Sequence, residues 1–152
     1  MAKAGGATVH ASAVLAGASA VLIRGPVAAG KSRLALDLIA AADSGRIDFA
    51  RLVGDDRVEL TAAHGRLLVR PAQRLRGLIE VRGLGIRRLD YEPVAVVGLV
   101  VDLAEPAAER LPGKNARRVA IEGVDLPRLA VAPGADPLPA VLASLLTTAA
   151  EV

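Results

Sequence analysis

The stretch AVLIRGPVAAGKSRLALDLIAAA, residues 20–42, carries the signal that decides the fold. An apolar strand over 20–24 leads into the pattern G-x-x-x-x-G-K-S, and a helix follows in which apolar residues recur at helical spacing. Such a loop turns backbone N–H groups toward phosphate oxygens, and the helix adds its positive N-terminal end. The alternative is a chance glycine turn between strand and helix, which motif and context together disfavour. The sequence therefore predicts a phosphate-binding P-loop.

Two side chains of the loop have a defined chemistry. Lys31 is expected to reach the β- and γ-phosphates of a nucleoside triphosphate, and the Ser32 hydroxyl to ligate Mg²⁺. Ala28 and Ala29 stand where P-loops often carry glycine. The predicted nucleotide-binding residues are Gly25, Pro26, Val27, Ala28, Ala29, Gly30, Lys31 and Ser32.

A pair of acidic residues follows the next apolar strand. Residues 50–53 are apolar and short, and Asp55 and Asp56 come directly after them. In P-loop enzymes an acid at this place lies close to the magnesium ion of the nucleotide. Alone, two aspartates after a strand are most often a solvated turn. After a P-loop, a catalytic role is the better interpretation.

The rest of the chain alternates strands with two helices and a hairpin, which predicts an α/β sheet domain. All 152 residues are interpreted as one domain. Residues 58–60 and 66–70 bracket Ala63-His64-Gly65 and predict a hairpin. The apolar run over 94–103 predicts a buried strand, and residues 138–152 an alanine- and leucine-rich helix. Further strands are expected over 10–15, 20–24, 50–53 and 118–121.

Composition excludes several classes of protein. Phe49 and Tyr91 are the aromatic residues, so a base-stacking surface for nucleic acid is not expected. Cysteine is absent, and two histidines cannot build a histidine-rich metal site. The longest apolar run, over 94–103, is far short of the roughly 20 residues of a membrane-spanning helix. The N-terminal residues make a poor signal peptide, and we expect a cytoplasmic protein with no membrane or nucleic-acid partner.

Four segments together resemble a known family. His10, the P-loop, LVGDDRVEL at 52–60 and IEVRGLGI at 79–86 are similar to the catalytic domain of HPr kinase/phosphorylase, over about residues 9–136. The second of the two quoted strings is the most specific. The resemblance is to the short form associated with proteobacteria, without the N-terminal domain of longer members. It implies the fold shared with PEP carboxykinase, a hexameric assembly, and ATP- and Mg²⁺-dependent phosphorylation of a serine on an HPr-type phosphocarrier protein of a phosphotransferase system.

The resemblance also implies roles for individual residues. Asp56 matches the acid/base that takes the serine proton, and Asp55 lies on the metal side of it. Glu80 matches the second magnesium ligand, an oxygen donor suited to a hard cation. His10 matches the active-site histidine, and Arg110 the arginine that clamps the transferred phosphoryl group. His64 matches no family position and is interpreted as a hairpin residue.

Departures from the family pattern concern the reverse reaction, in which inorganic phosphate attacks phosphoserine. Ala132 and Ala135 occupy a loop in which the family carries two arginines, so weak phosphorolysis is expected. In the P-loop, Val27 and Ala28 stand where the family usually has Ser and Gly. The alternative to an enzyme is a nucleotide-binding regulatory protein of the same fold that has lost catalysis. A small-molecule kinase is a third interpretation, although the chain has little room for a lid and a base-recognition element.

Overall fold

The computed structural model describes residues 7–150, and it consists of strands with two α-helices. The strands before the middle of the chain are β1 (Thr8–Ala16), β2 (Ser19–Arg24), β3 (Ala50–Gly54), β4 (Arg57–Ala63) and β5 (Arg66–Pro71). Those after it are β6 (Leu78–Val81), β7 (Gly85–Arg88), β8 (Ala95–Asp102), β9 (Arg118–Ile121) and β10 (Val124–Ala130). The helices are α1 (Lys31–Asp43) and α2 (Leu138–Leu146), with short 3-10 turns at Gln73–Leu75 and Asn115–Arg117.

Five strands close into a ring. The sheet order runs β2-β1-β4-β5-β8, and β8 pairs again with β2, so the path returns to its start. The β2–β8 and β8–β10 pairs are parallel, whereas the other pairs of the large sheet's named strands are antiparallel. Alternate residues of the ring, among them Leu22, Val58, Val69 and Val100, form one hydrophobic core.

The contact between β2 and β8 depends on a glycine. A Cβ atom on Gly98 would lie 2.2 Å from Ser19 Oγ and 2.7 Å from Ser19 Cβ. The register between the two strands shifts by a residue at this point, between Ala20 and Val21. A side chain at position 98 would therefore push apart the parallel strands that bring residues 24 and 102 side by side at the end of β2.

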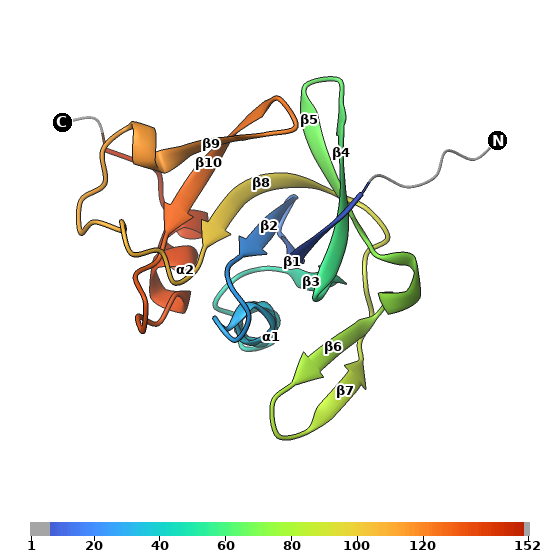
Figure 1. Cartoon of the computed structure of the whole chain (residues 1–152). Helices are drawn as coiled ribbons and strands as arrows, with labels where there is room; N and C mark the ends of the chain where they lie inside the picture. The colour runs from blue at the N-terminus through green and yellow to red at the C-terminus, as the bar shows by residue number, and fades with distance from the viewer. Residues whose placement is uncertain (1–6, 151–152) are drawn as a thin grey trace.

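A second core lies between the other face of the strands and both helices. It joins Val14, Ile23 and Val101 of the sheet to Leu38 of α1 and Val141 of α2. Figure 1 shows α1 against this face near β1, β2 and β3, and α2 near the end of β10. The same picture shows the β6–β7 hairpin extending away from the body of the domain. The P-loop joins the end of β2 to the start of α1, and α1 is packed against the sheet.

Most predicted elements are confirmed. The helix expected over 31–42 is α1, and the hairpin expected around His64 is formed by β4 and β5, with His64 and Gly65 both at positive φ. The buried strand expected over 94–103 is β8. Residues 77–86, for which the sequence predicts no helix or strand, form most of the β6–β7 hairpin. Strand β10 was not predicted at all.

The C-terminal helix is shorter than predicted. Helix α2 ends at Leu146, and Thr147 is extended, with φ −132° and ψ 171°. Its N–H and hydroxyl both donate to the carbonyl of Ala143, which closes the last turn. Residues 147–150 are exposed and pack no apolar face against the core. Tertiary packing therefore does not stabilise a longer helix there. Residues 151–152, included in the prediction, lie outside the described part.

No helix within residues 7–150 has the length and apolar character needed to cross a membrane.

Candidate nucleotide-binding and catalytic site

A cavity of about 1120 Å³ opens between the P-loop, the start of α1, the β6–β7 hairpin and the loop that follows β10. It brings together residues that are far apart in the sequence. The predicted site residues that line it are His10, Val27, Ala28, Ala29, Gly30, Lys31, Ser32, Asp56 and Glu80. Ala132 and Ala135, from the loop that follows β10, also line it.

The backbone of the P-loop is shaped by two residues in the left-handed region. Gly30, at φ +99°, caps the N-terminus of α1, and Ala28 has φ +65°. Left-handed residues next to right-handed ones turn successive N–H groups to one side and form an anion-binding concavity. Glycine adopts this conformation without strain, whereas Ala28 does not. The positive φ of this position explains why many P-loops carry glycine there.

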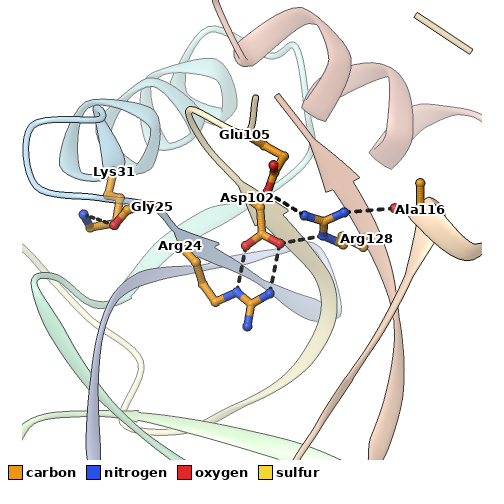
Figure 2. A network of polar contacts seen from close by, with 7 residues as sticks. All are labelled: Arg24, Gly25, Lys31, Asp102, Glu105, Ala116 and Arg128. Atoms are coloured by element: carbon orange, nitrogen blue, oxygen red, sulfur yellow. Dashed lines mark hydrogen bonds and ion pairs between the residues drawn. The ribbon is translucent and has the colours of Figure 1, made fainter. Parts of the chain in front are cut away.

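The lysine of the loop is buried and folded back on it. Lys31 Nζ donates to the carbonyl oxygens of Gly25 at 2.8 Å and Pro26 at 2.9 Å, and Figure 2 shows the first of these bonds. Burial lowers the pKa of Lys31, although the charges of Asp56 and Asp55 oppose that shift. The ammonium group therefore lies against the P-loop. The sequence predicts that both bind the phosphates.

Asp55 is a buried carboxylate held from three sides. It is 3% exposed, and its Oδ1 accepts hydrogen bonds from Ser12 Oγ at 2.6 Å and Ser32 Oγ at 2.7 Å. Its Oδ2 accepts from the backbone N–H of Glu80 at 3.1 Å and lies 2.8 Å from Ser32 Oγ. The carboxylate thus links β1, the start of α1 and β6. Ser12 was not identified from the sequence, because a serine on a strand carries no motif.

Asp56 points to the other side and is open to solvent. Its backbone is left-handed, at φ +69°, and its side chain is 63% exposed. His10 Nε2 lies 3.0 Å from Asp56 Oδ1. An ionised carboxylate only accepts, so the imidazole nitrogen donates in this pair. The turn between β3 and β4 therefore places two consecutive aspartates in different surroundings. Asp55 is buried, and Asp56 lines the cavity.

Glu80 and Arg110 differ in how the structure places them. Glu80 is exposed on β6, where it pairs with Ile86 of β7, and it lines the cavity. Arg110 is exposed on the loop between β8 and β9, and it is not among the residues that line the cavity. The structure brings Glu80 to the site but not Arg110, whose assignment stays a prediction from the sequence.

An ionic network joins β2, β8 and β10 next to the start of the P-loop (Figure 2). Arg24 donates to both oxygens of Asp102, at 2.7 and 2.9 Å, and Arg128 Nε donates to Asp102 Oδ2 at 2.6 Å. Arg128 also donates to Glu105 Oε2 and to the carbonyl of Ala116. Burial alone would raise the pKa of Asp102, but the two arginines outweigh it and hold that pKa below its ordinary value. The sequence contains no signal for this network.

The donor set suits magnesium bound together with a nucleotide. No group of three or more His, Cys, Asp or Glu side chains able to enclose a metal occurs within residues 7–150. The Ser32 hydroxyl, the Asp55 carboxylate bonded to it and the Glu80 carboxylate supply oxygen atoms at or near the predicted phosphate-binding loop. Mg²⁺ prefers oxygen ligands and is commonly held by one or two protein groups plus substrate phosphates. The residues present therefore fit a phosphate-bound magnesium ion.

Comparison with solved structures places this fold among known ones. The chain superimposes on the HPr(Ser) kinase/phosphatase from Coxiella burnetii with a TM-score of 0.72 and 24% sequence identity. The match covers 91% of this chain and 88% of that one. This likeness shows that the two proteins share a fold.

Sequence comparison gives the family. The chain is 35% identical over 103 residues to the HPr kinase/phosphorylase of Mycoplasma mycoides subsp. mycoides. The matched segment covers 63% of this chain. The match covers 31% of that relative, so the chain spans about a third of its length. The family model of the HPr Serine kinase C-terminal domain matches residues 3–135, a range that includes the P-loop, both aspartates and the β6–β7 hairpin. This match shows that the chain belongs to the family of HPr serine kinase C-terminal domains.

Proposed function

We propose that this chain is the catalytic domain of an ATP-dependent kinase that phosphorylates a serine of an HPr-type phosphocarrier protein. One observation carries the proposal. His10 and Asp56 line the same cavity as the P-loop, so that a carboxylate able to accept a proton would face the phosphates of a nucleotide bound there. Family membership supports the same reaction.

The proposed binding of ATP uses the loop backbone and two of its side chains. Backbone N–H groups of residues 25–32 and the N-terminus of α1 would hold the phosphates, and Lys31 would leave its carbonyl partners to contact the β- and γ-phosphates. Ser32 and Glu80 would hold Mg²⁺, with Asp55 accepting the Ser32 proton. When bound, the ion neutralises charge that develops on the phosphates during transfer.

The proposed chemical step depends on Asp56. His10 occupies Oδ1, which leaves Oδ2 free to accept the proton of the attacking serine hydroxyl. The serine oxygen then forms the bond to the γ-phosphorus as the bond to the ADP oxygen breaks. His10 would orient the carboxylate through this hydrogen bond. Arg110 is kept in the proposal by the resemblance alone, as a clamp for the phosphoryl group.

The remaining parts of the proposal concern context. We expect the domain to work as a single unit over residues 1–152, to assemble into a homo-oligomer, for which the resemblance suggests a hexamer, and to act in the cytoplasm. The reverse reaction, with inorganic phosphate as acceptor, would use the same Asp56 carboxylate as a proton donor and acceptor.

The test is to incubate the purified chain with γ-labelled ATP, Mg²⁺ and the HPr homologue of its own genome, and to locate the label by mass spectrometry. We expect one phosphoserine on the carrier. Two controls are the carrier with that serine changed to alanine and the Asp56→Asn chain. Tight binding of Mg-ATP without any transfer to the carrier would contradict a kinase and favour a nucleotide-binding regulatory protein.

A further inference from the structure

Three polar or charged residues are buried within the described part of the chain, namely Ser12, Lys31 and Asp55. Ser12 and Lys31 line the cavity, and Asp55 is hydrogen-bonded to Ser12 and to Ser32. Lys31 and Asp55 have a part in the proposed nucleotide site, whereas Ser12 has none. Its side chain is 0% exposed, in a protein that otherwise fills such places with apolar groups. A hydroxyl is stable in that environment only if it is hydrogen-bonded.

Ser12 and His10 form a pair on strand β1. Residues two apart on a strand project from the same face, and both line the cavity. His10 contacts Asp56 at 3.0 Å and Ser12 contacts Asp55 at 2.6 Å. Two neighbouring side chains on one face of β1 therefore hydrogen-bond the two successive aspartates between β3 and β4. This relation follows from the pairing of β1 with both β3 and β4.

Two donors to Asp55 are fully buried or belong to the backbone, and we call them its fixed donors. They are the Ser12 hydroxyl, which is 0% exposed and bonds Oδ1, and the backbone N–H of Glu80, which bonds Oδ2. Between them lies Ser32 Oγ, within 2.7 and 2.8 Å of the two oxygens. The two fixed donors hold the carboxylate in one orientation. In that orientation both of its oxygens lie within hydrogen-bond distance of Ser32 Oγ, so the Ser32 hydroxyl donates its proton to Asp55.

The direction of the Ser32 proton matters for magnesium. A hydroxyl has one proton and two lone pairs, so a proton directed at Asp55 leaves the lone pairs free for the cavity. That is the state in which Ser32 can ligate a hard cation. Without Ser12, one oxygen of a buried carboxylate loses its fixed donor, and the carboxylate can turn away from this arrangement.

We propose that Ser12 is a positioning residue of the magnesium–nucleotide site: its hydroxyl fixes the Asp55 carboxylate so that Asp55 accepts the Ser32 proton and directs the Ser32 oxygen at the cation. The proposal rests on the proposed function, since it assumes that Ser32 ligates Mg²⁺. Ser12 acts through Asp55 and does not itself touch the nucleotide.

The test measures ADP affinity by calorimetry with and without Mg²⁺, a readout independent of phosphoryl transfer. The variants are Ser12→Ala, and Ser12→Cys as a replacement of similar size with a weaker donor. Ser19→Ala is the matched control, because it removes a hydroxyl from the neighbouring strand β2 at a position outside the cavity lining. We expect Ser12→Ala to weaken Mg-ADP binding by about tenfold and metal-free ADP binding by less than twofold. Ser12→Cys should lie between wild type and Ser12→Ala, and it carries the test if Ser12→Ala does not fold.

Two outcomes of the calorimetry would contradict a positioning role for Ser12. Equal losses with and without Mg²⁺ would mean that Ser12 supports the fold alone, and an unchanged affinity for Mg-ADP would mean that it positions nothing. Either outcome overturns the inference and leaves the proposed kinase intact, provided that the wild-type chain binds Mg-ADP. A wild-type chain that binds no Mg-ADP would overturn both. In the kinase assay, Ser12→Ala should raise KM for Mg-ATP with a much smaller change in kcat, because Asp56 is untouched.

Discussion

His10 Nε2 lies 3.0 Å from Oδ1 of Asp56, although the two residues are 46 positions apart in the chain. The contact arises because β1 runs antiparallel to β4 and places His10 opposite Arg57, the residue after Asp56. The left-handed backbone of Asp56 turns its carboxylate toward the cavity, whereas that of Asp55 is buried beneath the P-loop. Neighbouring acids of identical chemistry thus acquire different surroundings, and these surroundings lead to the first prediction.

Asp56→Asn should lower phosphoryl transfer by at least about 100-fold, because an amide keeps the shape of the side chain but cannot take the serine proton. Affinity for Mg-ATP should change less than twofold, since the exposed side chain is bonded to His10 and is not among the proposed ligands of the nucleotide. Single-turnover transfer and calorimetry measure the two quantities.

Asp55→Asn is the contrasting variant. It places an amide N–H₂ group against hydroxyl and N–H donors in a buried site, so it should weaken Mg-ATP binding and lower the free energy of unfolding. If Asp55→Asn abolishes transfer with normal binding and Asp56→Asn does not, the roles of the two acids are the reverse of those proposed.

Lys31→Ala should abolish measurable binding of Mg-ATP while the domain remains folded. The ammonium group is the buried positive charge beside the phosphate-binding loop, and backbone dipoles alone do not replace it. Calorimetry gives the affinity and circular dichroism the fold. Lys114→Ala, which removes an exposed lysine outside the cavity lining, is the control and should bind as wild type does. An unchanged affinity in a folded Lys31→Ala protein would remove the assignment of this loop.

Phosphorolysis of the phosphorylated carrier should be slow relative to the kinase reaction. Ala132 and Ala135 line the cavity, are exposed, and offer no positive charge to an incoming phosphate beside an anionic phosphoserine. Loss of one charged donor typically costs a few kcal/mol of transition-state stabilisation. The measurement follows phosphoserine loss in millimolar phosphate without ATP. A double variant, Ala132→Arg with Ala135→Arg, should accelerate this direction selectively. Wild-type phosphorolysis as fast as phosphorylation would show that arginines are not needed there.

Asp102→Asn should lower the free energy of unfolding by about 2 kcal/mol at neutral pH, because two arginines lose a charged acceptor that is largely buried. The pKa of Asp102 is lower in the folded chain than its ordinary value of 3.8, so the folded state binds this proton less readily. The stabilisation is therefore fully present above the ordinary pKa and is lost as the pH falls through the folded one.

Denaturant titrations at several pH values measure this effect. The wild type should lose stability below about pH 4 more steeply than Asp102→Asn does. Asp125→Asn is the control, because Asp125 is 67% exposed in its pair with Arg118, and its replacement should change stability little. Parallel pH curves for wild type and Asp102→Asn would contradict the proposed coupling.

Ala28→Gly should raise the free energy of unfolding by about 0.5–1 kcal/mol, because glycine adopts the left-handed conformation of this position without a clash at Cβ. Ala29→Gly is the matched control: its φ is not positive, so the substitution should lower stability by a similar amount. Chemical denaturation measures both. A destabilised Ala28→Gly variant would mean that the strain at Ala28 is negligible.

The sequence alone predicted the elements whose signals are local. The motif from Gly25 to Ser32 predicted the P-loop, and the spacing of apolar residues after it predicted α1 almost to the residue. The turn at His64 and Gly65 predicted the β4–β5 hairpin. In each case the physical cause lies within a few neighbouring residues. Where the signal was compositional, as for the alanine- and leucine-rich C-terminus, the prediction extended α2 past its end at Leu146.

Tertiary structure alone decided what these elements do together. The contacts of His10 with Asp56 and of Ser12 with Asp55 depend on the register between β1 and the strands that flank the two aspartates. The network around Asp102 depends on the parallel pairs that β8 makes with β2 and β10. Side chains alternate between the two faces of a strand, so a shift of one residue in any of these pairs would move each group to the opposite face. Register is set by packing across the whole sheet, and for that reason no local pattern in the sequence reveals which residues meet.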